Sequence, residues 1–207
     1  MPVPRIITLA ITGASGSVFA RRMLCALEDD PRVAHINLVA SDSGLRVLAE
    51  ELGLASRNDL PRQLLGTEPA KTHLQSNQDI GANIASGSYP TDAMVVLPCS
   101  MGTLAKIANG VADKLIERAA DVCLKERIPL VLCVRETPFN RIHLRNMCLA
   151  AEAGATIYPM IPAFYNHPST VDEMVCQFVS RVLKHIGLPQ EGAYVWKPGS
   201  SPAPSPL

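Results

Sequence analysis

The sequence lacks an apolar run long enough to cross a membrane, and it lacks an excess of charge of either sign. Its longest apolar segments have the length of strands, and 19 Lys and Arg residues balance 19 Asp and Glu residues. A membrane-spanning helix is therefore excluded, and a dedicated nucleic-acid or anionic-membrane surface is not expected. The opening residues, MPVPRIITLA, contain no small-residue cleavage site, which predicts an unprocessed, cytoplasmic protein.

Paired cysteines are also missing. The six cysteines lie mostly in apolar, periodic segments, and none forms a CxxC or another spacing that zinc requires. No histidine is near Cys99 in the sequence, so we expect a buried thiol there rather than a nucleophile. The pattern predicts reduced cysteines and no metal site.

What the sequence does contain is an alternation of strand-like and helical segments. A chain of 207 residues that is 47% apolar can form one domain with a sizeable core. Continuous apolar runs predict strands buried on both faces at 5–11, 33–40, 93–98, 129–134 and 155–161. Helical patterns cover 16–29, 42–53, 101–127 (broken near Gly110), 139–153 and 170–187. This alternation predicts an α/β fold, a doubly wound and mostly parallel sheet of Rossmann-like or flavodoxin-like type, with helices on both faces.

Two segments depart from that pattern. Residues 54–92 are polar, and we interpret them as one long connection with room for a short helix. A connection of this length in a compact domain either has a function or contains a missed element. The proline-rich segment 191–207 is expected to be an unpacked tail after a single domain that spans 1–190.

Two glycine-containing turns follow predicted strands, where open parallel sheets bind ligands. Thr12-Gly13-Ala14-Ser15-Gly16 allows a tight turn, and Ser15 either caps the next helix or binds a phosphate. It lacks the middle glycine of GxGxxG, so a structural turn explains it about as well as a phosphate cradle. Ser100-Met101-Gly102-Thr103 is a second candidate anion site, and the pair favours a nucleotide-like ligand.

Charged residues also lie at or near the predicted strand ends. Arg135 and Glu136 directly follow an apolar strand, which favours an anion-binding arginine beside a carboxylate placed for proton transfer over a surface ion pair. Arg118 and Lys125 are two turns apart on one helix face. A solvated face is the default explanation of that spacing, and phosphate binding is the alternative.

Four further residues each allow two interpretations. Ser41 and Asp42 follow the second strand, where a helix N-cap is favoured over ribose binding. Tyr165 lies in an aromatic loop after the last strand and either closes the end of the sheet or reaches a ligand. Arg181 lies on an otherwise apolar helix and either borders it or binds an anion.

Five ordered motifs closely resemble the UbiX-type flavin prenyltransferases, formerly described as small subunits of aromatic-acid decarboxylases. They are TGASG at 12–16, PCSMGTLAKIANG at 98–110, LIERAADVCLKER at 115–127, VRETPFNRIHLRNM at 134–147 and PAFYNHP at 162–168. The resemblance runs from about residue 5 to 189, without the loop at 54–84. It implies metal-independent transfer of a dimethylallyl group from dimethylallyl phosphate to N5 and C6 of reduced FMN. The product, prenylated FMN, would serve a partner decarboxylase of the UbiD type, and the enzyme would be a homo-oligomer, a dodecamer.

The resemblance also implies roles for individual residues. FMN would be bound by Gly13, Ala14, Ser15, Ser41, Ser100, Met101, Gly102, Thr103 and Arg135. The prenyl phosphate would be bound by Arg118, Lys125, Tyr165 and Arg181. Glu136 and Ser15 would be catalytic, with Glu136 in proton transfer, and Glu51 matches a further polar position near the site. Because the site offers no metal ligands for a diphosphate, we expect the monophosphate donor.

Departures from the family pattern occur at Phe19 and Ala20, where many relatives have Tyr-Gly, and at Tyr89, in a variable loop. We expect Tyr89 to alter closure of the entrance or flavin stacking. Two other functions remain as alternatives: an FMN-dependent cysteine-type decarboxylase, and a non-catalytic flavin-binding accessory subunit. The set of Arg118, Lys125, Tyr165 and Arg181 discriminates against the first, and a nicotinamide oxidoreductase ranks lower because GxGxxG is broken.

Overall fold

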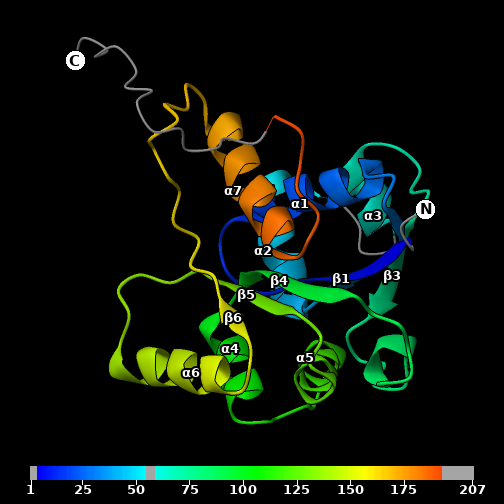
Figure 1. Cartoon of the computed structure of the whole chain (residues 1–207), viewed down its shortest axis with the longest axis vertical. Coiled ribbons are helices and arrows are strands. Elements are labelled where there is room, and N and C mark those ends of the chain that lie inside the picture. Colours follow the sequence, from blue (N-terminus) through cyan, green and yellow to red (C-terminus); the bar gives the residue numbers. More distant parts are fainter. Residues whose placement is uncertain (1–3, 55–58, 193–207) are drawn as a thin grey trace.

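A six-stranded parallel sheet organises the chain in the computed structural model, which describes residues 4–54 and 59–192 (Figure 1). The strand order is β3-β2-β1-β4-β5-β6, and every neighbouring pair is parallel. The strands are β1 (Arg5–Ile11), β2 (Val33–Ala40), β3 (Thr72–Ser76), β4 (Ala93–Cys99), β5 (Leu130–Val134) and β6 (Thr156–Ile157). The order reverses between β1 and β4, which is the topological switch point where such sheets bind ligands.

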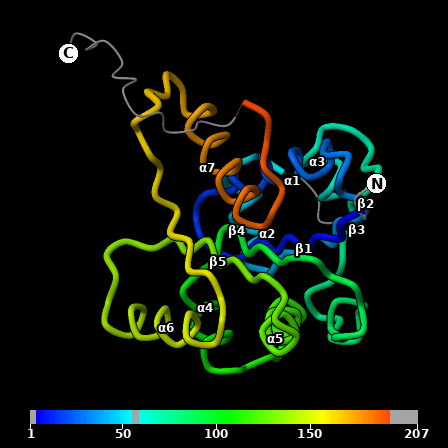
Figure 2. Tube along the Cα trace, viewed as in Figure 1, coloured from blue at the N-terminus to red at the C-terminus, as the bar shows by residue number. Residues whose placement is uncertain are grey.

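Helices cover both faces of the sheet (Figure 1). One face carries α1 (Ser17–Asp29), α2 (Asp42–Leu52), α3 (Leu60–Leu65) and α7 (Val171–His185). The other carries α4 (Met101–Ala108), α5 (Leu115–Glu126), α6 (Arg141–Glu152) and the 3-10 turn η1 (Asn83–Ala85). The segment between β6 and α7 runs from the edge of the sheet to the upper helical layer (Figure 2). The predicted doubly wound α/β fold is confirmed.

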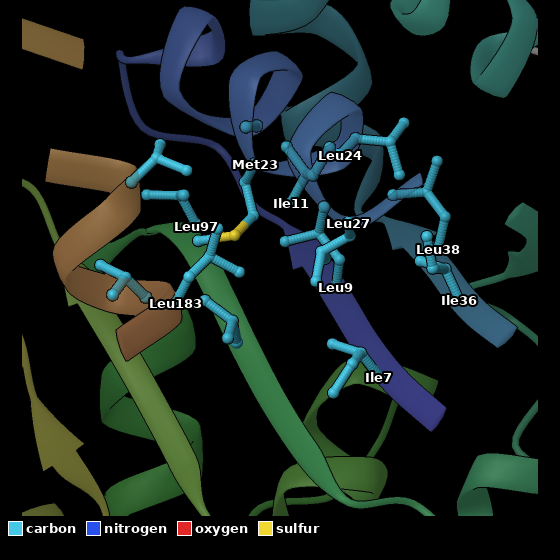
Figure 3. Packing of buried hydrophobic residues seen from close by; sticks show 14 of the residues in the cluster. Ile7, Leu9, Ile11, Met23, Leu24, Leu27, Ile36, Leu38, Leu97 and Leu183 are labelled. Atoms are coloured by element: carbon cyan, nitrogen blue, oxygen red, sulfur yellow. The ribbon is translucent and has the colours of Figure 1, made fainter. Parts of the chain in front are cut away.

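Two hydrophobic clusters, one on each face, explain why the central strands are continuously apolar. Ile7, Leu9 and Ile11 point toward α1 and α7, whereas Ala10 belongs to the cluster beneath α4 and α5 (Figure 3). Because alternate residues of a strand face opposite sides, a strand covered by helices on both sides needs apolar residues at every position.

The structure differs from the sequence prediction at the sheet edges. The long connection contains the short helix α3 and a strand, β3, that we missed, because its sequence THLQS is polar and only Thr72 is buried. The last strand, predicted over 155–161, has two paired residues, and Pro159 and Pro162 lack the amides that a longer strand would use. By contrast, the break predicted near Gly110 in the helix over 101–127 is confirmed, because residues 109–114 separate α4 from α5 and Gly110 has a φ of 68°. The predicted tail lies outside the described residues from 193 onward.

Candidate active site

The hydroxyl of Thr12 joins the two glycine-containing turns at the switch point. Its Oγ1 donates to the carbonyl of Pro98 at 2.9 Å and accepts from the amide of Ser100 at 2.8 Å. The Thr12 amide also donates to the Pro98 carbonyl at 3.1 Å. The turn after β1 and the turn after β4 are therefore held side by side, as neighbouring strands require.

The start of α4 has the geometry of an anion-binding site. Ser100 is the N-cap, and its Oγ accepts from the amide of Thr103 at 3.3 Å and donates to the Thr103 hydroxyl at 3.2 Å. The first amides of a helix have no partner within the helix, and they lie at the positive end of its dipole. A Cβ added to Gly102 would meet only Ser100 Oγ, at 4.0 Å. The space beside these amides is open to a ligand.

Arg135 extends this site from the next strand. It directly follows β5, its side chain is exposed, and its amide donates to the carbonyl of Cys99 at 3.2 Å. Glu136 is also exposed, and its Oε1 accepts from the Thr137 amide at 2.9 Å. No ion pair joins Arg135 to Glu136 in the described part of the chain. Both charges are therefore available to a ligand at the carboxyl edge of the sheet.

The start of α1 differs, because a carboxylate of the chain already lies there. Glu51 accepts from the amide of Gly16 at 3.0 Å and from that of Ser17 at 2.7 Å. Burial favours a higher pKa for Glu51, but hydrogen bonds from Ser15, Ser17 and Gly16 outweigh it and lower the pKa. An ionised carboxylate at this helix end repels a second anion. A second anion is therefore less favourable at the start of α1 than at the start of α4.

The second strand end closes against the turn after β1. Ser41 is the N-cap of α2, with its Oγ accepting from the Gly44 amide at 3.0 Å, and Asp42 is the first residue of the helix. A Cβ at Gly13 would lie 2.4 Å from Ser43 Oγ. Only glycine allows the backbone of the turn to approach α2 this closely.

Tyr165 and Arg181 lie together in an open pocket of about 1030 Å³ between the β6–α7 segment and α7. Arg181 hydrogen-bonds to Tyr158, whose pKa burial raises while Arg181 acts to lower it. The pocket is lined by Ile157, Tyr158, Pro159, Ile161, Ala163, Tyr165, Asn166, Gln177, Phe178, Ser180, Arg181, Lys184 and His185. Its aromatic and apolar walls with cationic groups suit an apolar ligand that carries a negative charge.

Arg118 and Lys125 lie on α5, on the other face of the sheet (Figure 1). Arg118 Nε donates to the carbonyl of Ala85 at 3.1 Å, and Nη1 pairs with Asp121 Oδ2 at 2.7 Å. Lys125 pairs with Glu126 beside Gly87. The structure thus brings the four predicted phosphate-binding residues together as two pairs, and the pairs do not converge within one chain.

The degree of burial explains the roles of Phe19, Ala20 and Cys99. Phe19 packs edge-on against Phe178 with ring centroids 5.1 Å apart, and Ala20 is fully buried, so this departure from the family pattern belongs to the core. Cys99 is buried, and desolvation raises the pKa of its thiol far above the ordinary value, as expected of an unreactive cysteine. Among residues 4–54 and 59–192, no helix is long and apolar enough to cross a membrane.

Sequence reasoning missed several contributors to the site. Thr12 appeared only as part of a turn, and Tyr158 as part of a strand. Asn166 lines the pocket, and its Nδ2 is buried without a hydrogen-bond partner in the described residues. Lys184 had one available signal, since it lies three residues after Arg181 and therefore on the same helix face.

The fold and the anion site at its switch point define a nucleotide-binding doubly wound α/β protein, and the comparisons make this class specific. The model of the flavoprotein family matches residues 2–182. Flavin prenyltransferase UbiX of Salmonella typhimurium is 45% identical over 181 residues, 87% of this chain and 91% of the relative. UbiX of Escherichia coli K12 is 41% identical over 191 residues, 91% of this chain and 96% of the relative. The chain belongs to the UbiX flavin prenyltransferases within the flavoprotein family.

Solved structures agree. A crystal structure of AnUbiX (PadA1) in complex with FMN and dimethylallyl pyrophosphate has a TM-score of 0.84 and 38% identity, covering 94% of this chain and 98% of that one. A dodecameric FMN-dependent UbiX-like decarboxylase from Escherichia coli O157:H7 has a TM-score of 0.83 and 41% identity, covering 93% and 99%. An FMN-dependent cysteine decarboxylase, TvaF, has a TM-score of 0.56 and 17% identity, covering 73% and 88%, and shares the fold alone.

Proposed function

We propose that this protein transfers a dimethylallyl group from dimethylallyl phosphate to N5 and C6 of reduced FMN. The observation that carries the proposal is the pocket with Tyr165 and Arg181, because a transferase must bind the phosphate end of its donor. A flavin-dependent cysteine decarboxylase has no need of such a pocket. The sequence similarity to named prenyltransferases supports the same reaction.

FMN fits the residues at the switch point. The amides at the start of α4, with Ser100, Met101, Gly102, Thr103 and Arg135, would hold its phosphate and ribityl end. The flavin ring would be contacted from the ends of β1 and β2 by Gly13, Ala14, Ser15 and Ser41. The ring carries no phosphate, so these contacts need no positive charge. Reduced FMN supplies the nucleophilic positions that accept the prenyl group.

The chain's own cations would stabilise the leaving phosphate. Cleavage of an allylic phosphate builds negative charge on the phosphate oxygens, and fixed cations and donors stabilise that charge. Arg118, Lys125 and Arg181 supply the charge, and Tyr165 supplies a hydroxyl. The apolar pocket walls exclude water from the allylic carbon while it carries positive character.

Glu136 and Ser15 would move protons. Glu136 is exposed next to Arg135 at the carboxyl edge of the sheet, where it would take a proton from the flavin side and pass it toward the phosphate. Ser15 hydrogen-bonds to Glu51, which orients its hydroxyl. Glu136→Gln should keep FMN binding and slow single turnover, as measured by the rate of flavin mass increase. Unchanged turnover would remove Glu136 from the mechanism.

A complete site needs a second copy of the chain. Arg118 and Lys125 are on the opposite face from Tyr165 and Arg181, so one protomer's pair would meet the other pair of a neighbour. The segment that carries Tyr165 and the start of α7 are unusually apolar for an exposed surface, with Ile161, Phe164 and Val171 exposed by 70%, 64% and 67%. We therefore propose a dodecamer, the state named for the similar Escherichia coli O157:H7 structure. The product would pass to a UbiD-type decarboxylase in the cytoplasm.

Mass spectrometry of the flavin tests the function directly. Under anaerobic conditions the protein is mixed with reduced FMN and dimethylallyl phosphate, and the molecular mass of the extracted flavin is measured. An increase by one five-carbon prenyl unit is the expected result. Tightly bound but unmodified FMN would favour an FMN-dependent decarboxylase or an accessory flavin-binding subunit instead. Repeating the reaction with the diphosphate, with and without magnesium, tests the proposed preference for the monophosphate, and activity with the diphosphate alone would contradict it.

A further inference from the structure

Tyr89 is turned inward, contrary to the expectation that it acts on the entrance or on the flavin. Its ring is partly buried and packs against the hydrophobic cluster between the sheet and helices α4 and α5. Its hydroxyl accepts from Asn37 Nδ2 at 3.4 Å. Asn37 is on β2 and completely buried. The hydroxyl of Tyr89 therefore reaches the sheet itself.

Asn37 is the centre of a hydrogen-bonded group that links the sheet to η1. Its Oδ1 accepts from Gln75 Nε2 at 2.6 Å and from Asn83 Nδ2 at 3.3 Å, and Gln75 also donates to Asn83 Oδ1 at 2.6 Å. A buried amide that loses a partner keeps its desolvation cost. The side chain of Tyr89 is thus attached to a buried asparagine that further hydrogen bonds hold in place.

The loop that Tyr89 holds lies directly against α5. The Tyr89 amide donates to the Ser86 carbonyl at 3.2 Å, which closes a turn over 86–89. At one side of this turn Arg118 Nε donates to the Ala85 carbonyl at 3.1 Å. Within the turn, Gly87 lies against the Glu126 carboxylate and the Lys125 ammonium, and an added Cβ would lie 2.6 Å from Lys125 Nζ. The same short loop therefore contacts both cations of α5.

We propose that Tyr89 is a positioning residue, which holds the 85–89 loop on Asn37 and thereby keeps Arg118 and Lys125 in place for the prenyl phosphate. The inference rests on the proposed function for the identity of that ligand. It assigns the departure from the family pattern at this position to substrate binding through the cations rather than to the flavin.

Tyr89→Phe is the decisive change, because it removes the hydroxyl and keeps the ring. Losing one buried hydrogen bond should raise KM for dimethylallyl phosphate by about threefold to tenfold, with kcat and FMN affinity unchanged within about twofold. In an Arg118→Lys background the same change should raise KM by a smaller factor, because the part of the effect that acts through Arg118 is already lost. Hydrogen exchange of the 83–90 amides should become faster.

A matched control separates positioning from a general loss of stability. Thr72→Val removes a buried hydroxyl that bonds to Glu28 Oε2 at 2.5 Å, at the amino end of β3 and away from the loop. It should lower the denaturation midpoint without changing KM. An unchanged KM in Tyr89→Phe, a rise that is fully additive with Arg118→Lys, or an equal rise in Thr72→Val would overturn the proposal. Failure of the wild-type protein to prenylate FMN would refute the proposed function and not the positioning role. Unchanged hydrogen exchange of the 83–90 amides in Tyr89→Phe would by itself overturn the positioning role.

Discussion

Glu51→Gln is the sharpest test of how the turn after β1 works. The Glu51 carboxylate accepts from the Gly16 and Ser17 amides, and α1 has no side-chain cap on its own N-cap residue. Glutamine keeps one carbonyl oxygen but removes the charge. The lost interaction with the helix dipole is about 0.3–1 kcal/mol, and one weakened hydrogen bond adds about 0.5–1.5 kcal/mol. Because the side chain is exposed, solvent screening keeps the total near the low end, about 1 kcal/mol.

Urea unfolding at two pH values measures this effect. The pKa of Glu51 is lower in the folded protein than its ordinary 4.5, so its contribution is present at neutral pH and is lost as the pH falls through the folded value. The difference between wild type and Glu51→Gln should therefore be seen at pH 7 and should shrink below the ordinary carboxyl range. Glu50→Gln is the matched control, because Glu50 makes an exposed ion pair with Arg46, which contributes little.

Two results would refute the reasoning. Equal destabilisation by Glu50→Gln and Glu51→Gln at pH 7 would show that the carboxylate does not cap α1. A difference between wild type and Glu51→Gln that persists undiminished in acid would show that the charge of Glu51 is not the cause.

Three further variants test the phosphate-binding pairs and the core. Gly87→Ala places a methyl group against the paired Glu126 carboxylate and Lys125 ammonium and displaces both. KM for dimethylallyl phosphate should therefore rise severalfold in steady-state assays, with stability changed by less than about 0.5 kcal/mol; an unchanged KM would contradict this. Arg181→Met should lower kcat/KM by at least about tenfold and leave FMN affinity intact in fluorescence titrations, and lost flavin binding would place Arg181 elsewhere. Phe178→Ala removes a ring that packs edge-on against Phe19 and Tyr158 and should cost about 3–5 kcal/mol in chemical denaturation; a cost below about 1 kcal/mol would mean that the ring is not packed.

The central strands and the main helices were predictable because burial on both faces leaves a strong local pattern. β1, β2, β4 and β5 begin and end within one residue of the predicted bounds. The edge strands were not predictable in the same way. β3 is mostly exposed and polar, and β6 pairs through two residues only, so neither has the apolar run by which a buried strand is recognised.

Some features of the candidate site could be predicted from the sequence, and others could not. The hydroxyl- and glycine-containing turns could be found because strand ends and helix caps are local in sequence. Ser41 is the predicted N-cap of α2, and Ser100 is the N-cap of α4. The capping of α1 by Glu51 could not be found, since the hydrogen bonds join residues 34 and 35 positions apart. The inward position of Tyr89 depends on Asn37, 52 residues away.

The amino-acid sequence by itself determined the α/β class, the turns at the switch point and the family to which the chain belongs. Only the tertiary structure decided which helix end is free for an anion, and only it separated Arg118 and Lys125 from Tyr165 and Arg181. The physical reason is that motifs and periodicity are properties of neighbouring residues. The face of the sheet on which a helix packs, and the partner that a buried polar group finds, depend on contacts between segments far apart in the chain.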